Sequence, residues 1–86
     1  MISHAPPYGT KADAVPSGAV ARHVGSYAVR RFIEAAKPVL AICGHIHEAR
    51  CVDRLGGCTI VNPGPAKLGR YAIVKLSGGQ AEVDMK

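Results

Sequence analysis

The sequence predicts a single α+β domain with one clear helix and several short strands in mixed or antiparallel pairing. One observation is an apolar stripe at helical spacing between residues 26 and 37. Another is a set of short apolar or alternating runs, each bounded by glycine or proline. Because the 86 residues are 48% hydrophobic, they can form one small core but no more, so we treat residues 1–86 as one domain.

The first element is a short strand, because residues 1–4 read as the end of one. Residues 5–25 carry repeated prolines and glycines, which predicts a long loop. Pro6 and Pro7 fix φ and exclude a helix there, whereas Gly9 permits a tight reversal.

The helix is predicted to begin after Ser26, a good N-cap residue, and to run to about Lys37, before Pro38. Its apolar positions follow the spacing i, i+3, i+4 and i+7, namely Val29, Phe32, Ile33 and Ala36. We therefore expect this stripe to face the core.

Four strands are expected after the helix. Residues 39–43 are continuously apolar, which is typical of a buried strand, and residues 58–62 form a second short strand. Residues 70–76 and 80–85 predict a hairpin that turns at 77–79, with alternation that leaves one wet face on the last strand.

The charge and the cysteines exclude several classes of function. The net charge is +5, but the cations are scattered and not interleaved with aromatic residues, so a nucleic-acid partner is not favoured. No apolar run is long enough for a membrane span, and no signal-peptide pattern is visible. Because three cysteines without CxxC spacing are typical of reduced thiols, we expect a cytoplasmic protein.

Three histidines lie where predicted strands end: His4, His45 and His47. Residues two apart on extended backbone share a face at about 6–7 Å, and imidazole nitrogen suits Zn, Fe, Mn or Ni. We therefore expect these rings to converge on one metal ion or on two neighbouring ions. The alternatives are polar surface histidines, or a structural zinc site with Cys51 or Cys58, although the spacing matches no common zinc pattern.

Smaller candidates surround this group. Glu48 either orients an imidazole or is an exposed loop acid. The side chain of Asn62 is expected to close the turn at residues 63–64, and Asp13 either anchors the long loop or is an ordinary solvated acid. We interpret His23 as a surface residue and Cys43 as a small buried hydrophobe.

Three blocks in order carry a family resemblance: Ser-His-Ala-Pro-Pro-Tyr-Gly-Thr at 3–10, Cys-Gly-His-Ile-His-Glu-Ala at 43–49 and Val-Asn-Pro-Gly-Pro at 61–65. They resemble calcineurin-like metallophosphoesterases, in particular the small prokaryotic branch, and this resemblance extends over nearly the whole chain. The resemblance implies a β-sandwich flanked by helices, with a two-metal site at the strand ends.

The resemblance also implies roles for the histidines. His4 matches the fourth family motif, and His45 and His47 match the fifth, GHxH. By this match His4 and His45 share one ion and His47 binds the other, with Mn, Fe, Zn or Mg as the metal. A hydroxide bridging the ions would attack the phosphorus of a phosphomonoester or phosphodiester.

The sequence departs from the family in its acids. The first three family motifs, D-x-H, G-D and G-N-H-D/E, have no match in residues 1–86. We therefore expect the C-terminal part of a phosphoesterase, inactive as this chain, whose metals are partial or missing. Its expected partners are the phosphoester substrate of the complete enzyme and either a missing N-terminal half or further copies of itself. The alternative function is a non-catalytic module that self-associates or binds a partner.

Overall fold

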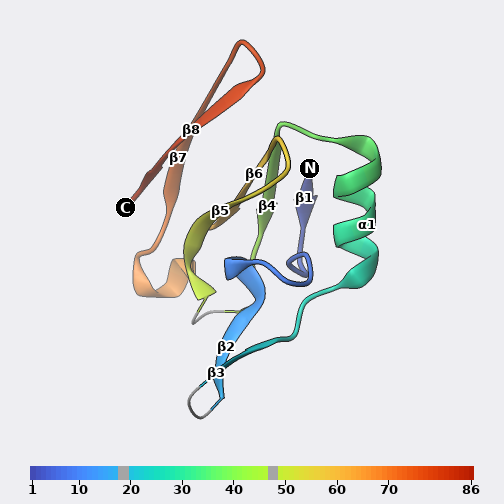
Figure 1. The fold of residues 1–86 in the computed structure, drawn as a ribbon. Coiled ribbons are helices and arrows are strands. Elements are labelled where there is room, and N and C mark those ends of the chain that lie inside the picture. The colour runs from blue at the N-terminus through green and yellow to red at the C-terminus, as the bar shows by residue number, and fades with distance from the viewer. Residues whose placement is uncertain (18–19, 47–48) are drawn as a thin grey trace.

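The computed structural model of the protein describes residues 1–17, 20–46 and 49–86 (Figure 1). The described residues form one α-helix, two short 3-10 helices and eight strands, and the predicted α+β class is confirmed. In chain order the elements are β1 (Ile2–Ser3), η1 (Lys11–Asp13), β2 (Ala14–Ser17), β3 (Val20–His23), α1 (Tyr27–Ala36), β4 (Leu40–Cys43), β5 (Cys51–Leu55), β6 (Cys58–Asn62), η3 (Ala66–Leu68), β7 (Ala72–Ser77) and β8 (Gln80–Met85).

The central sheet has four strands in the order β1-β4-β6-β5. β1 and β6 both run parallel to β4, and β5 pairs with β6 in the antiparallel direction. The register places Ser3 beside Cys43, so the carboxyl ends of β1 and β4 finish side by side. This pairing determines where the residues after both strands lie.

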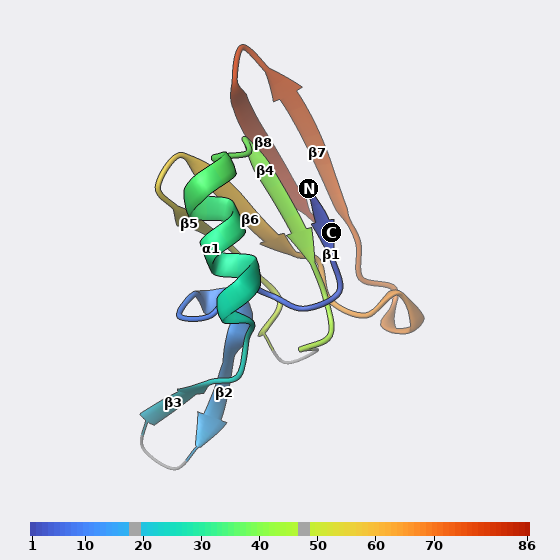
Figure 2. The same ribbon diagram turned by 90° about the vertical axis from the view of Figure 1, so that its right-hand side faces the viewer.

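The helix α1, the central sheet and the β7–β8 hairpin form three layers. α1 lies against one face, and the β7–β8 hairpin lies on the side opposite α1 (Figures 1 and 2). The β2–β3 hairpin projects from the end of the sheet at which β1 and β4 finish (Figure 1). None of the described helices has the length and apolar character needed to cross a membrane.

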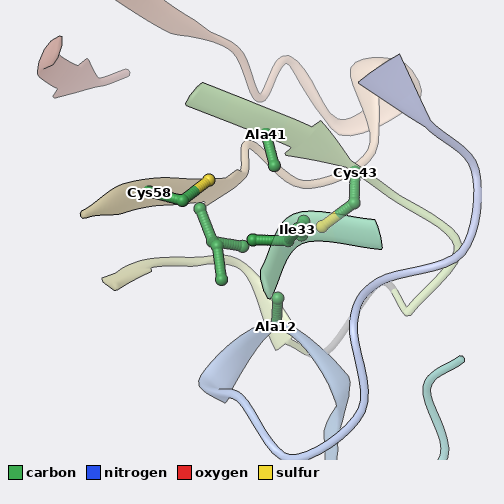
Figure 3. Close-up of a cluster of buried hydrophobic side chains, with 6 residues drawn as sticks. Ala12, Ile33, Ala41, Cys43 and Cys58 are labelled. Atoms are coloured by element: carbon green, nitrogen blue, oxygen red, sulfur yellow. The ribbon is translucent and has the colours of Figure 1, made fainter. Parts of the chain in front are cut away.

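The core lies between α1 and the sheet. Figure 3 shows Ile33 of α1 among residues from the sheet and from η1. The buried cluster consists of Ala12, Ile33, Ala41, Cys43, Cys58 and Ile60. Because the core is one small layer of side chains between helix and sheet, each large residue in it contributes a large share of the buried apolar surface.

The helix prediction is confirmed in its bounds. The Ser26 hydroxyl accepts a hydrogen bond from the Val29 amide at 3.1 Å, and Lys37 ends the helix in a left-handed conformation with φ 51°. The predicted core stripe is only partly right, because Ile33 is 1% exposed but Phe32 is 53% exposed. Adjacent helical residues point about 100° apart, so a single helix on a narrow sheet buries one line of residues rather than a broad stripe.

The prediction of a continuous loop over residues 5–25 is wrong. This segment contains η1 and the antiparallel β2–β3 hairpin, whose register pairs Val15 with Arg22 and Ala14 with His23. Pro16 does not prevent the pairing, because both strands of a two-stranded sheet are edges and one side of each needs no hydrogen bonds.

The later strands match the prediction except for one that was missed. β4, β6 and the β7–β8 hairpin are confirmed, and both turn glycines, Gly78 and Gly79, have positive φ. β5 was not predicted, because Asp53 and Arg54 interrupt its apolar character. It pairs with β6 at the edge of the sheet, where alternate side chains are exposed to water.

Candidate functional site

His4 and His45 lie together at the carboxyl end of the central sheet. His4 follows β1 directly, and His45 follows β4 after Gly44. The Gly44 amide donates to the His4 carbonyl at 3.2 Å, which continues the parallel pairing beyond the strands. Their ring centroids are 4.6 Å apart at an interplanar angle of 60°, and both residues are exposed. Parallel pairing of β1 with β4 therefore joins two imidazoles that are 41 positions apart in the chain.

The backbone at His45 is unusual. His45 has φ 64°, and the Ile46 amide donates to the Gly44 carbonyl at 2.7 Å, which closes a tight turn. A non-glycine residue with positive φ is uncommon, and such conformations concentrate at functional sites when the surroundings hold them in place. Ile46 is buried and anchors the turn on its C-terminal side.

Asn62 holds this turn from the neighbouring strand. Its buried side chain donates from Nδ2 to the Ile46 carbonyl at 2.8 Å and accepts at Oδ1 from the Gly64 amide at 3.1 Å. The amide thus closes the turn after β6 and also connects that turn to the segment that carries His45. Asn62 therefore supports the turn that carries His45, and both polar ends of its side chain are bound to backbone rather than free for a metal ion.

Replacing Asn62 with alanine is expected to lower the free energy of unfolding by about 2 kcal/mol, because the Ile46 carbonyl and the Gly64 amide lose their partner. The measurement is urea unfolding, together with the proton NMR shift of the His45 ring. Thr59→Val serves as the control, since Thr59 is buried in the same strand and the change keeps its volume. Equal losses in both variants, with an unmoved His45 signal, would contradict the role of Asn62.

Asp13 organises the loop between β1 and α1. Its buried carboxylate accepts from the amides of Gly9, Thr10 and Gly25, each at 3.0 Å, and from His23 Nδ1 at 2.6 Å. Burial alone would raise the pKa of Asp13, but the hydrogen bonds from His23 and the three amides outweigh it and lower that pKa. Asp13 is therefore a structural anion that ties the loop to the end of β3.

Gly25 completes this anchor because no other residue fits. A Cβ at Gly25 would lie 2.6 Å from the Pro6 carbonyl oxygen and 2.7 Å from the Asp13 Cβ. Both neighbours are held in place, since Ser26 donates to the Pro6 carbonyl at 2.8 Å and Asp13 has four partners. The segment before α1 can therefore approach the loop only where it lacks a side chain.

His23 is more than the surface residue that the sequence suggested. Its side chain is 37% exposed, yet its Nδ1 is bound to the buried Asp13. The signal that could have found this contact is the β2–β3 hairpin, because the pairing of Ala14 with His23 brings His23 next to Asp13. In the linear sequence, nothing else indicates that Asp13 and His23 are in contact.

His47 and Glu48 lie outside the described residues. Within the described ranges, no group of three or more His, Cys, Asp or Glu side chains is arranged to hold a metal ion. His4 and His45 nevertheless present two imidazole groups of the type that Zn, Mn and Fe accept as ligands. The described residues therefore fit one part of a metal site, without the carboxylates that offset the charge of a divalent ion.

The three cysteines are free thiols with raised pKa values. Burial is the main cause that raises the pKa of Cys43 to about 12 and the pKa of Cys51 to about 11. Cys58 is buried as well, and burial also raises its pKa. Among the described residues, none of these thiols belongs to a group of three or more potential metal ligands. Cys43 behaves as the small buried hydrophobe that the sequence predicted.

Comparison with known proteins identifies the class to which this fold and histidine pair belong. The family described as metallophosphoesterase, calcineurin superfamily, matches residues 1–86, and the chain belongs to this family. Over 67 residues the chain is 46% identical to an uncharacterized protein of Methanocaldococcus jannaschii; the match covers 76% of this chain and 30% of that relative. The chain thus matches less than a third of the length of that curated relative. No solved structure matches the chain significantly.

Proposed function

We propose that this chain provides the C-terminal, histidine-bearing part of a dinuclear-metal phosphoesterase that hydrolyses phosphomonoesters or phosphodiesters. In this proposal His4 and His45 hold one divalent ion and His47 holds the other. The observation that carries this proposal is the short distance between the His4 and His45 rings, whose centroids lie 4.6 Å apart at the ends of two parallel strands. The family match supports the same assignment.

When bound, divalent ions at such a site neutralise the charge of phosphoryl oxygens and activate water. The other residues of this chain hold and orient the two histidines. The Gly44 amide keeps the two histidine segments in register, and Asn62 fixes the turn that sets the His45 ring. The backbone at both histidines is thus held by hydrogen bonds, one of them from a buried amide side chain.

We further propose that the acidic ligands come from a preceding segment or from another chain. Two aspartates near the loop already have structural partners: Asp13 has four, and Asp53 accepts from the amides of Lys11 at 2.9 Å and Arg54 at 2.8 Å. Neutral histidines alone do not offset the charge of two divalent ions. Residues 1–86 alone would therefore bind metal weakly and would not turn over phosphoesters. A reducing, cytoplasmic location is part of this proposal, because all three thiols are free.

The proposal is tested by titrating the chain with Zn²⁺ or Mn²⁺ in a calorimeter. His4→Ala and His45→Ala should each weaken binding by about tenfold to a hundredfold, since even the groups that orient a ligand have effects of that size. Cys51→Ser is the matched control and should leave the affinity unchanged. Unchanged affinity in both histidine variants would overturn the metal assignment.

Activity is tested separately with an aryl phosphodiester and Mn²⁺. The isolated chain should show no hydrolysis above the uncatalysed rate. Turnover that is abolished by His45→Ala would show that the chain is a complete enzyme, contrary to the proposal.

The second candidate function is a non-catalytic module that associates with further copies of itself. β1 is an edge strand of only two residues, and its Ile2 is 84% exposed. Open strand edges with apolar side chains favour pairing between chains. A stable oligomer in light scattering, with no measurable metal affinity, would favour this function over the first.

A further inference from the structure

A pair of stacked tyrosines lies outside the histidine pair. Tyr8 belongs to the loop after β1, and Tyr27 is the first residue of α1. Their ring centroids are 4.1 Å apart at an interplanar angle of 19°. The Tyr8 amide donates to the Ser26 carbonyl at 3.1 Å, and Arg30 Nη1 donates to the Tyr8 carbonyl at 3.0 Å. The stack is therefore held in place by its backbone and does not depend on the two rings alone.

The outer ring of this stack is open to solvent. Tyr27 is 60% exposed, although Tyr8 stacks on one of its faces. The neighbouring Tyr8 side chain raises the pKa of Tyr27, and a phenol with an ordinary pKa of about 10 is already neutral near pH 7. A neutral aromatic face on a fixed support is a platform on which a planar ring can stack.

A hydrogen-bonding group lies beside the stack. The His23 ring meets Tyr8 at 5.8 Å and 60°, and Asp13 holds its Nδ1. The His23 side chain is 37% exposed, and Nε2 is not the nitrogen that binds Asp13. The Arg30 guanidinium binds the Tyr8 carbonyl at 3.0 Å and pairs with Glu34 at 3.5 Å. The cluster thus combines an aromatic face with polar and cationic groups.

We propose that Tyr8, Tyr27 and His23 form a site that stacks the base of a nucleotide. The chemistry favours a ligand in which a planar ring is joined to an anionic group, because stacking is sequence-tolerant and Arg30 and His23 offer polar contacts. The site lies at the end of the sheet where α1 begins and where β1 and β4 finish (Figure 1). Its assignment to the substrate rests on the proposed phosphoesterase function, because the phosphoester would then be a nucleotide.

The test is NMR titration of the metal-free chain with adenosine 5′-monophosphate. The chain has three tyrosines and no tryptophan, so the aromatic signals can be followed one by one. Ring-current shifts are expected at Tyr8, Tyr27 and His23, and not at Tyr71. Ribose 5-phosphate, which lacks the base, should bind about tenfold more weakly, as the loss of one stacked base implies.

The variants compare two tyrosines of similar exposure. Tyr27→Ala should weaken binding about tenfold, and Tyr27→Phe should retain it, because stacking needs the ring and not the hydroxyl. Tyr71→Ala is the matched control, since Tyr71 is 56% exposed and lies near β7, and it should leave binding unchanged.

Two outcomes would overturn the site: no saturable shift of the Tyr27 ring at millimolar nucleotide, or equal weakening by Tyr27→Ala and Tyr71→Ala. The wild-type ring shifts decide the question even if Tyr27→Ala fails to fold. Because no metal is present, nucleotide binding can fail while the His4–His45 pair still binds Zn²⁺. The two proposals are therefore tested independently.

Discussion

Replacing Asp13 with alanine is expected to lower the free energy of unfolding by about 3 kcal/mol, since several hydrogen-bond donors in the loop lose a charged acceptor. The donors are three backbone amides and the His23 ring. A domain of this size has a total stability of roughly 5 kcal/mol, so the variant should retain only about 2 kcal/mol. Urea unfolding followed by circular dichroism measures the difference.

The same carboxylate predicts a dependence on pH. The pKa of Asp13 is lower in the folded chain than its ordinary value of 3.8. Its stabilisation is therefore fully present above the unfolded pKa of about 4 and is lost as the pH falls through the lower, folded pKa. The stability gap between wild type and Asp13→Asn should shrink as the pH falls below about 4.

Asp84→Ala is the matched control for this prediction. Asp84 is mostly exposed and pairs with Lys86 at the surface, so its loss should change the stability by no more than about 1 kcal/mol. If Asp13→Ala were as mild as Asp84→Ala, the loop would not depend on the buried carboxylate. The positions of Tyr8 and His23 would then need another explanation.

The second large effect is expected at the centre of the core. Ile33→Ala should lower the free energy of unfolding by about 3 kcal/mol, because it removes a buried side chain and leaves a cavity between α1 and the sheet. Ile33 is the residue of α1 that is fully buried among the described positions, and it belongs to the cluster with Ala41 and Ile60. Chemical unfolding and the loss of helical signal measure the effect.

Phe32→Ala supplies the comparison on the same helix. Phe32 is larger than Ile33 but lies mostly in water, so its removal should change the stability by about 0.5 kcal/mol or less. A larger loss for Phe32→Ala than for Ile33→Ala would mean that another part of the protein or another chain covers Phe32 in solution. It would also contradict the helix orientation described above.

Three buried polar groups connect stability to the candidate site. Asn62 holds the His45 turn, Asp13 holds the loop that carries Tyr8, and Thr10 donates from its hydroxyl to the Pro7 carbonyl at 3.0 Å within that loop. Each of these groups stabilises a segment that would otherwise be irregular backbone. These hydrogen bonds define the shape of the described parts of the loops at this end of the sheet.

Local sequence signals predicted the elements whose ends are set by capping or turn residues. Ser26 and Pro38 bounded the helix, and the paired glycines at 78–79 placed the last turn. The strand at 51–55 and the β2–β3 hairpin were missed because their residues are polar or contain proline, and only pairing with a neighbour makes them strands. An edge strand is hydrogen-bonded to a neighbour on one side only, and a local sequence pattern does not reveal that partner.

The amino-acid sequence by itself determined the α+β class, the family and the choice of His4 and His45 as candidate ligands, because these depend on residue type, spacing and motif. Only the tertiary structure decided that the His4 and His45 rings touch, that Asn62 supports their turn and that Asp13 binds His23. Each of these contacts joins segments that are distant in the chain, through parallel strand pairing or a hairpin. Such proximity follows from the fold as a whole, and spacing along a single strand or helix does not encode it.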